Sequence, residues 1–271
     1  PTQRKTLNRA TDMRMPVGSS IKPIAVYAPA IELGASPATI VYNMPLPIKG
    51  WTGSDGKDSW PRNYGGGGYV GPQTLRQAMK RSHNVSAAQT LMNYVGVETS
   101  AEYLMRMGVD RKNIDVTPYG LSLGSSGITP LQESVAFGTL ANGGVYQKPI
   151  SFLGISDSNG HVVYDSHAQQ LRTQVFRPST AWLIVDMMKD VVSGGTATSA
   201  KISGQTVAGK TGTNTDSRGV TFCGLTGWYV SAIWIGHDNY KPLSSKATGG
   251  NAAAPLWQSY MSKIHKDKGL E

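Results

Sequence analysis

The chain has 271 residues, with 26 Lys and Arg against 17 Asp and Glu and a formal net charge of +9. This length suits one large domain or two small ones and buries an ample core in either case. The single cysteine, Cys223, excludes an internal disulfide and a cysteine-rich metal site, and the five histidines lack the spacing of a zinc protease. Because no run of about 18 apolar residues occurs, no segment is predicted to span a membrane.

The excess of positive charge would suit an anionic partner such as nucleic acid, a cell-envelope polymer or a membrane surface. Lysines and arginines are scattered, however, and the one dense cluster is Lys263–Lys268 near the C-terminus. Neither a zinc-finger spacing nor an RNP-type aromatic pattern accompanies it. We therefore favour a generally basic surface and predict no nucleic-acid partner; a nucleic-acid-binding module would show steeply salt-dependent affinity.

The first long apolar-periodic segment begins at Gly18 and predicts a helix to about Leu33, where Gly34 ends it. Ser19 and Lys22 stand three residues apart at its start and would share a face, about 5–6 Å apart at Cβ. A serine hydroxyl becomes a nucleophile when a base takes its proton, and a lysine can do so once burial or nearby positive charge lowers its pKa. The free N–H groups of a helix start would also stabilise an oxyanion. The pair predicts a serine nucleophile with a lysine base.

The Ser-x-x-Lys pattern is a weak signal by itself, because average composition predicts about one match in a chain of this length. A second match occurs at residues 54–57, among glycines and aspartates with no apolar period, and we interpret it as a solvated turn. The apolar segment that follows Ser19 distinguishes the first match from the second.

Residues 37–71 are rich in Gly, Pro, Asp and Asn and predict a long ordered loop with a short strand at Thr39–Tyr42. A helix at Gln73–Lys80 follows, with Thr74 as its N-cap, and a second helix carries the apolar residues between Val85 and Val95. Ser82-His83-Asn84 connects the two helices. Its serine and asparagine, two positions apart on a connection, can both point into a cleft, although a solvated turn is the simpler interpretation of this segment alone.

The remaining elements follow from periodicity and turn residues. We expect helices at residues 100–107, 130–140, 178–194 and 253–265, a turn at 117–120, a hairpin with strands at 150–155 and 161–164, and strands at 205–213, 220–224 and 228–235. The last strand is apolar on both faces, as expected of a central strand covered twice. Helices come first, then strands, then a helix that returns to the sheet. This order predicts an α+β fold: an antiparallel sheet flanked by helices, a mainly helical subdomain, and an active-site cleft between them.

Lys210-Thr211-Gly212 closes the strand predicted at residues 205–213, and it and Ser82-x-Asn84 each occur once in the chain. With Ser19-x-x-Lys22 they resemble, in this order, the motif set of penicillin-binding proteins and class A β-lactamases. The resemblance to the transpeptidase domain of bifunctional class A penicillin-binding proteins covers nearly the whole chain. It includes Trp60-Pro61-x-Asn63-Tyr64, Leu123-Gly124-Ser125-Ser126, Thr129-Pro130, Ala141–Gly144, Val207–Thr213 and Thr248-Gly249-Gly250.

This resemblance implies a fold like that of serine β-lactamases and transpeptidases. It also implies that residues 1–271 form a single transpeptidase domain, a fragment without the glycosyltransferase module and the membrane anchor of longer family members. The implied activity is that of a serine D,D-transpeptidase, which cross-links peptidoglycan stem peptides ending in D-Ala-D-Ala and is acylated by β-lactam antibiotics. The reaction would take place at the extracytoplasmic face of the bacterial membrane, to which only a longer parent chain would be tethered. No metal and no cofactor is implied.

The family's site residues are carried over by motif. Ser19 would attack the substrate carbonyl, Lys22 would accept its proton, and the backbone N–H groups of Ser19 and Thr213 would form the oxyanion hole. Ser82 would relay a proton to the leaving nitrogen, and Asn84 would hold the substrate amide and help to orient Lys22.

The strand motif would bind the substrate. Lys210 would lower the pKa of the neighbouring amine and attract the substrate carboxylate, which the hydroxyls of Thr211 and Thr213 would bind. Gly212 would leave room for substrate lying against the strand. Thr221 and Leu225 stand where the family usually has Trp and Tyr, at positions implied to line the sheet side of the cleft, where they would affect substrate preference and β-lactam affinity.

Two alternatives share these motifs. A class A β-lactamase would hydrolyse its acyl-enzyme through a glutamate-positioned water, but its Glu-x-x-x-Asn loop is not evident, since Glu98 and Glu102 lie on or near a helix and Glu133 follows Thr129-Pro130 within another. We therefore predict slow deacylation. A non-catalytic β-lactam sensor would be acylated once and would show no turnover of stem peptides.

Overall fold

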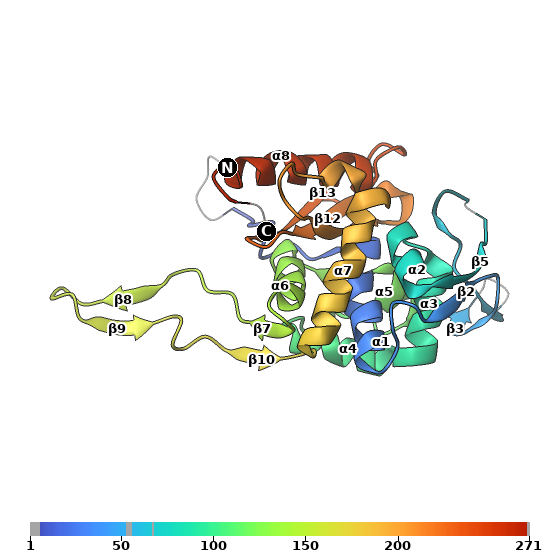
Figure 1. The fold of residues 1–271 in the computed structure, drawn as a ribbon, viewed down its shortest axis with the longest axis horizontal. Helices are drawn as coiled ribbons and strands as arrows, with labels where there is room; N and C mark the ends of the chain where they lie inside the picture. The colour runs from blue at the N-terminus through green and yellow to red at the C-terminus, as the bar shows by residue number, and fades with distance from the viewer. Residues whose placement is uncertain (1–5, 53–55, 67, 270–271) are drawn as a thin grey trace.

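The computed structural model describes residues 6–52, 56–66 and 68–269, so Ser54 of the second Ser-x-x-Lys match lies outside the described residues (Figure 1). The helices are α1 (Ala28–Glu32), α2 (Leu75–Arg81), α3 (Asn84–Thr90), α4 (Val97–Arg106), α5 (Pro118–Leu123), α6 (Pro130–Ala141), α7 (Pro178–Gly194) and α8 (Ala254–Ile264). The strands are β1 (Met15–Pro16), β2 (Ile40–Asn43), β3 (Ile48–Thr52), β4 (Asp58–Ser59), β5 (Gly71–Thr74), β6 (Gly127–Ile128), β7 (Val145–Gln147), β8 (Gly154–Ser156), β9 (Val162–Asp165), β10 (Arg172–Gln174), β11 (Ala208–Thr213), β12 (Gly219–Leu225) and β13 (Val230–Gly236). Within these ranges, no helix has both the length and the apolar character needed to cross a membrane.

An antiparallel sheet of three strands, in the order β11-β12-β13, forms the upper layer of the molecule in Figure 1. Every residue of β12 is buried, because a strand pairs with it on each side and helices cover both faces. The prediction that residues 228–235 form the central strand is therefore wrong. In the described residues β13 pairs with β12 alone and is half-buried throughout, so its apolar character on both faces reflects coverage by helices rather than a central place.

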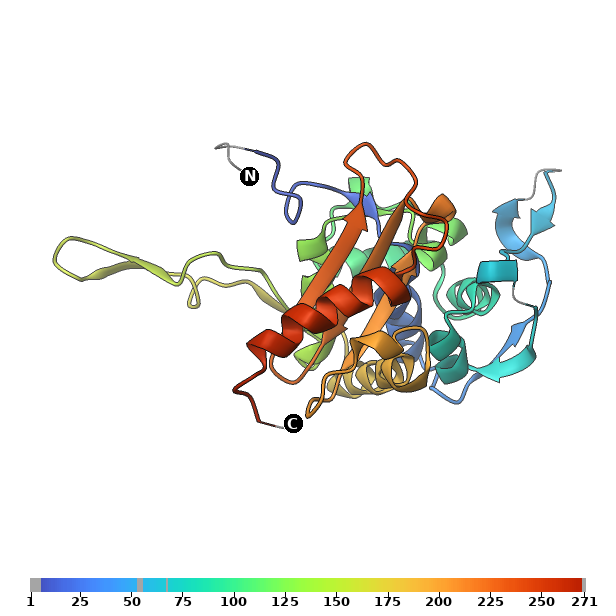
Figure 2. The same cartoon turned by 90° about the horizontal axis from the view of Figure 1, so that it is seen from above.

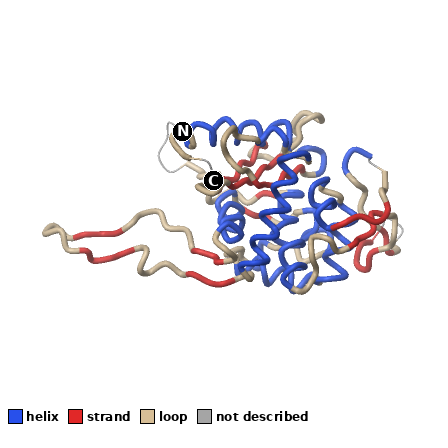
Figure 3. The backbone as a smooth tube through the Cα atoms, viewed as in Figure 1, coloured by secondary structure: helices blue, strands red, loops and turns tan. Residues whose placement is uncertain are grey.

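Helices cover the sheet on its two faces. In Figure 2, α8 crosses the strands from above, and its buried Trp257 packs edge-on against Phe222 of β12, with ring centroids 5.1 Å apart. On the opposite face α6 contacts β12 and β13, and α7 contacts β11. The mainly helical part, α1 to α5, lies beyond them, as Figure 3 shows by secondary structure. The predicted α+β architecture is confirmed.

The helix predicted from Gly18 is built from three short helical pieces. A 3₁₀ turn at Gly18–Ile21 (η1) is followed by a π-helical turn at Pro23–Tyr27 and by α1. Nearly all of this segment is buried, and its apolar residues join the main core. Ser19 lies in the 3₁₀ turn and Lys22 is its C-cap; because residues i and i+3 eclipse in a 3₁₀ turn, the shared face predicted for this pair does not depend on a regular α-helix.

Local sequence signals specify the elements that carry the other motifs. Thr74 caps α2, its hydroxyl accepting a hydrogen bond from the Gln77 N–H, as predicted. Arg76 on the same helix forms ion pairs with Asp186 and Asp190 of α7, at 2.6 and 3.0 Å. These part-exposed pairs contribute modestly to stability, but they fix the direction of the helix that ends at Ser82.

Two predicted loops contain regular structure. Residues 117–120, predicted as a turn, begin α5: Thr117 is the N-cap and Pro118 occupies the first turn, a combination that starts helices as well as turns. Residues 37–71 contain the paired strands β3 and β4 as well as β2, which pairs with β5.

The hairpin predicted around Asp157–Gly160 is confirmed as β8 and β9, although its first strand is shorter than predicted. The paired strands β7 and β10 lie at its base, and it projects far from the body of the molecule (Figure 1).

Candidate active site

The turn that carries Ser19 is held between two neighbouring segments. Gly18 adopts a positive φ of 66°, and its N–H donates to the carbonyl of Gly124, at the end of α5, at 3.0 Å. A Cβ at Gly18 would lie 2.9 Å from the backbone N of Thr213, and a Cβ at Gly124 would lie 2.0 Å from the carbonyl O of Gly18. Only glycines permit this approach, which brings the backbone of Ser19 beside the end of β11.

Gly212 makes the second close contact between the turn and β11. A Cβ at this residue would lie 2.0 Å from the Val17 carbonyl O and 3.1 Å from Ser20 Oγ. The reason predicted for this glycine, room for a substrate against the strand, is therefore incomplete. The glycine is required by the turn that carries Ser19, whose backbone packs directly onto it.

Lys22 is fully buried behind Ser19. Its Nζ donates to Asn84 Oδ1 at 2.7 Å, to the Ser82 carbonyl O at 2.9 Å and to Ser82 Oγ at 3.4 Å. Burial and, to a smaller degree, the neighbouring Lys210 hold the pKa of Lys22 well below its usual value. A lowered pKa favours the neutral amine, the form of lysine that can accept a proton.

The predicted direct contact between Ser19 and Lys22 is not the resting arrangement. Within the described residues, the hydrogen bonds of Lys22 Nζ go to Ser82 and Asn84, and none goes to Ser19. Catalytic hydrogen bonds are often long in the free enzyme and tighten only when substrate binds. Asn84, which the motif places beside Lys22, accepts the shortest of these hydrogen bonds.

Lys210 reaches the same serine from the sheet. Its Nζ donates to Ser82 Oγ at 2.8 Å and to the Thr211 carbonyl at 3.0 Å, and burial lowers its pKa to about 7. The two lysines thus converge on one hydroxyl from opposite walls. Ser82 itself has φ 59° and ψ 35°, a left-handed conformation that few residues other than glycine adopt. Such strain is retained where the surrounding structure imposes it, often at functional sites.

A second asparagine supports Asn84. The Nδ2 of Asn84 donates to the Arg62 carbonyl at 2.8 Å. The backbone N–H of Asn84 donates to Oδ1 of Asn63, the second asparagine, at 2.9 Å. Asn63 is buried and also donates to Asn43 Oδ1. Asn63 lies in the segment Trp60–Tyr64 that resembles the family, and the buried polar pair that it forms with Asn43 has no signal in the local sequence.

The hydroxyls expected to bind the substrate carboxylate already have protein partners. Thr211 Oγ1 lies 2.7 Å from Thr196 Oγ1, and Thr213 Oγ1 accepts a hydrogen bond from the Gly249 N–H at 3.2 Å. As an acceptor from Gly249, the Thr213 hydroxyl keeps its own proton free to donate. Thr196 is a contact that the motifs did not indicate.

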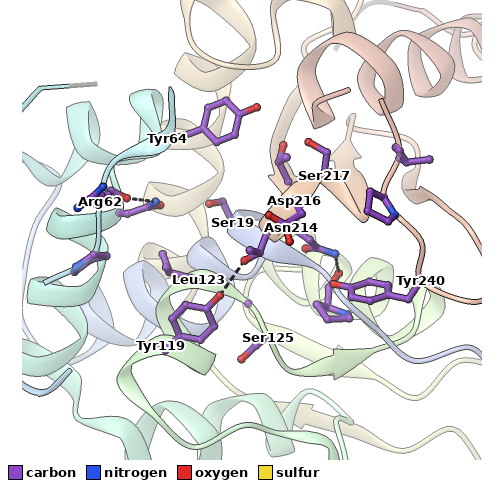
Figure 4. A pocket seen from close by; sticks show the side chains of 18 of the residues that line it. Ser19, Arg62, Tyr64, Tyr119, Leu123, Ser125, Asn214, Asp216, Ser217 and Tyr240 are labelled. Carbon is purple, nitrogen blue, oxygen red and sulfur yellow. Dashed lines mark hydrogen bonds between the residues drawn. The ribbon is translucent and has the colours of Figure 1, made fainter. Parts of the chain in front are cut away.

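Ser19 is half-buried and lines two cavities, the larger of which is drawn in Figure 4. The larger, of about 780 Å³, runs between Tyr64 and Arg62 on one wall and Asn214, Asp216 and Ser217 on the other. The smaller, of about 390 Å³, is lined by residues that include Ser82, Asn84, Thr196, Thr211, Thr213 and Thr248. In the described part of the chain, no three His, Cys, Asp or Glu side chains gather as a metal site would need.

Thr221 and Leu225, expected to line the sheet side of the cleft, do not reach it. Thr221 is fully buried and lies opposite Gly212 and Trp234 in the β-ladder. Leu225 is 5% exposed and borders a separate cavity beside Trp182 and Tyr229. These two departures from the family pattern change the interior of the sheet and its far end rather than the substrate-facing wall.

The chain was compared with known proteins. The family model of the penicillin binding protein transpeptidase domain matches residues 1–231. The chain belongs to this family. The penicillin-binding protein 1A of Clostridium perfringens (strain 13 / Type A) is 35% identical over 269 residues, which cover 96% of the chain, and that of Neisseria lactamica is 34% identical over 95% of it. The chain spans 39% and 32% of the length of these two relatives.

Solved structures agree in fold. Penicillin-binding protein 1A from Haemophilus influenzae superposes with a TM-score of 0.85 at 26% identity, over 99% of this chain and 45% of that one. PonA1 from Mycobacterium tuberculosis, solved in complex with penicillin V, gives 0.83 at 23% identity over 99% and 74%. Members of this transpeptidase family therefore share the architecture that here brings together Ser19, Lys22, Ser82, Asn84 and Lys210, from three separate parts of the sequence.

Proposed function

We propose that the chain is a serine D,D-transpeptidase domain, which joins peptidoglycan stem peptides through an acyl-enzyme on Ser19 and which β-lactams acylate at the same residue. The observation that carries the proposal is the convergence of two buried lysines on Ser82, beside a half-buried serine at the junction of two cavities. This arrangement supplies a base of lowered pKa, a proton relay and a nucleophile within one cleft.

The proposed acylation uses these groups in turn. Ser19 Oγ attacks the carbonyl carbon of a D-Ala-D-Ala peptide bond while Lys22 takes its proton. The negative charge that develops on the carbonyl oxygen is stabilised by the backbone N–H groups of Ser19 and Thr213. When the tetrahedral intermediate collapses, the bond to nitrogen breaks and Ser82 passes a proton from the lysine pair to the leaving amine. The product is an ester on Ser19 and free D-alanine.

The strand end holds the substrate in register. The carboxylate of the terminal D-alanine would accept hydrogen bonds from Thr211 and Thr213 in the smaller cavity, near the charge of Lys210. Asn84 would contact the substrate amide. The amine of a second stem peptide then attacks the ester carbonyl, the bond to Ser19 Oγ breaks, and the excess proton of the amine passes through Lys22 to that oxygen. A β-lactam would follow the first step only, because its amine stays attached after ring opening.

We further propose that residues 1–271 act as one transpeptidase domain and that the reaction takes place outside the cytoplasmic membrane, where the stem peptides are cross-linked. Relatives named penicillin-binding protein 1A, which are longer than this chain, support that setting.

Mass spectrometry after exposure to a penicillin tests the proposal. We expect one adduct of the full drug mass, located on Ser19, and no adduct on the Ser19→Ala variant. Rapid, repeated hydrolysis of a chromogenic cephalosporin would instead identify a β-lactamase. A stable adduct without any conversion of stem peptides would identify a sensor.

A further inference from the structure

Thr196 is a polar side chain at the smaller cavity to which the proposed mechanism gives no role. It follows the end of α7, is half-buried, and its Oγ1 lies 2.7 Å from Oγ1 of Thr211 on β11. Thr211 is the residue whose hydroxyl is proposed to bind the substrate carboxylate. Either threonine can donate in this hydrogen bond, so its direction decides what Thr211 can offer to a ligand.

The backbone around Thr196 is held from two sides. The N–H groups of its neighbours Gly195 and Ala197 both donate to the Val191 carbonyl of α7, at 3.1 and 3.0 Å. Gly250 packs against the Thr196 carbonyl, since a Cβ at Gly250 would lie 2.4 Å from that oxygen. These contacts fix Thr196 beside β11, so its hydroxyl meets Thr211 because the backbone places it there.

The charges around the smaller cavity suit an anion. Among the described residues that line it, none is an aspartate or a glutamate, and Arg81 is one of them. The fully buried Lys210 donates to Ser82 Oγ and to the Thr211 carbonyl, and both acceptors belong to residues that line the cavity. A carboxylate that enters would therefore meet positive charge without repulsion from a like charge on the described walls.

Two other hydroxyls of this cavity accept hydrogen bonds from the backbone. Thr213 Oγ1 accepts from the Gly249 N–H and Thr248 Oγ1 accepts from the Asn251 N–H, each at 3.2 Å. A hydroxyl that accepts in this way keeps its single proton for a ligand. For the Thr211 hydroxyl, the hydrogen-bond partner among the described residues is Thr196, so Thr196 stands in the place that a backbone N–H takes for the other two.

A bound carboxylate would fix the direction of the hydrogen bond between the two threonines. Because a carboxylate can only accept, Thr211 must turn its one proton toward the ligand. The contact with Thr196 then remains a hydrogen bond only if Thr196 is the donor. In that direction the protons form a chain from Thr196 to Thr211 to the carboxylate, in which each hydrogen bond strengthens the next.

We propose that Thr196 is a positioning residue for the terminal carboxylate of the substrate: it donates to Thr211 Oγ1, so that the Thr211 proton is directed to the anion. This inference rests on the proposed function and adds a determinant of its specificity. The pair favours a substrate that ends in a free carboxylate over the same substrate with that group esterified. An ester has no charge, and its hydrogen bond from Thr211 is correspondingly weaker.

The test compares acylation of the full chain by a penicillin, which carries a carboxylate, with acylation by the methyl ester of the same penicillin. Thr196→Val keeps the size of the side chain and removes the donor. We expect it to lower the second-order rate constant for the acid by about threefold to tenfold and to leave that for the ester within about twofold of the parent.

The ratio of the acid constant to the ester constant separates positioning from a merely structural role, because a distorted cleft would slow both reagents. Thr196→Ser keeps the donor and should retain the parent ratio. Thr198→Val, at an exposed threonine two residues further along the chain, is the matched control and should change neither constant. Equal losses for acid and ester in Thr196→Val would overturn the inference.

A double-mutant cycle shows whether Thr196 acts through Thr211. Thr211→Val should lower the ratio of acid to ester at least as far as Thr196→Val, and combining the two should lower it no further. If their effects on the ratio add, the inference is wrong. Thr196→Ala replaces Thr196→Val in the cycle if the valine variant does not fold. If the parent itself forms no penicillin adduct on Ser19, the proposed function fails instead, and the two failures are distinguishable.

Discussion

Gly212→Ala is the substitution whose effect can be worked out most directly from the structure. The added Cβ would lie 2.0 Å from the Val17 carbonyl O, whereas Cβ contacts under 3.0 Å are essentially never found. The obstacle is backbone, so it cannot rotate away as a side chain would. The turn that carries Ser19 must move from β11 by at least about 1 Å, and displacements of this size cost about 100-fold in rate when they disturb reacting groups.

We expect Gly212→Ala to lower the second-order rate constant for penicillin acylation by about 100-fold and to destabilise the fold by about 1–3 kcal/mol, the usual cost of overpacking. Stopped-flow or quenched-flow acylation gives the rate, and thermal unfolding gives the stability. Gly138→Ala is the matched control, because a Cβ there meets nothing within 4 Å among the described residues. As a helix-interior change on α6 it should add about 0.5–1 kcal/mol of stability and leave acylation unaltered.

The reasoning would be refuted by a Gly212→Ala variant that acylates within twofold of the parent and melts at the same temperature. That result would mean that the strand and the turn can separate without disturbing the oxyanion hole. A variant with the predicted loss of stability but normal acylation would confine the role of Gly212 to packing.

Three further experiments test separate parts of the structure. Lys210→Met removes a charge that lowers the pKa of Lys22, so the pKa of Lys22 should rise. The ascending limb of a plot of acylation rate against pH should then move to higher pH. A limb that does not move would contradict the effect of Lys210 on the pKa of Lys22. Ser82→Gly relieves the backbone strain of a left-handed residue at the end of α2, so it should raise Tm by roughly 2–4 °C while the acylation rate falls. A lower Tm in calorimetry would show that the serine is unstrained. The fully buried Cys223, whose thiol pKa is raised by burial, should resist iodoacetamide in the native protein and react after denaturation, as mass spectrometry can show; rapid native labelling would contradict its burial.

Local signals in the sequence predicted much of the fold. Thr129 and Gln132 form the capping box of α6, and the apolar stripe of α7 extends over the predicted range. The three motifs were expected to converge, and the hydrogen bonds of Lys22 and Lys210 to Ser82 join all of them. These features depend on short-range chemistry, which a sequence displays directly.

The missed features depend on packing between distant segments. Lys22 donates to Ser82 and Asn84 rather than to Ser19, and these acceptors come from a distant segment whose approach no local pattern displays. The burial of Thr221 follows from the place of β12 at the centre of the sheet, which strand order alone decides. The burial of Glu133, which is 1% exposed, was also missed, although the sequence carried a signal for it. Glu133 lies on the i, i+3, i+4, i+7 stripe of α6 with Ala136, Phe137 and Leu140, where an acidic residue is out of place.

The projecting hairpin of β8 and β9 is a suitable place to attach a label or a tag. Residues 151–165 are exposed throughout, including Leu153 at 71% and Val163 at 69%. A two-stranded ribbon with so little cover is marginally stable, so its tip should tolerate insertion of a peptide tag. A fluorophore or affinity sequence placed between Ser158 and Asn159 would lie well away from the body of the protein (Figure 2), which would allow the domain to be immobilised with the cavities at Ser19 left open.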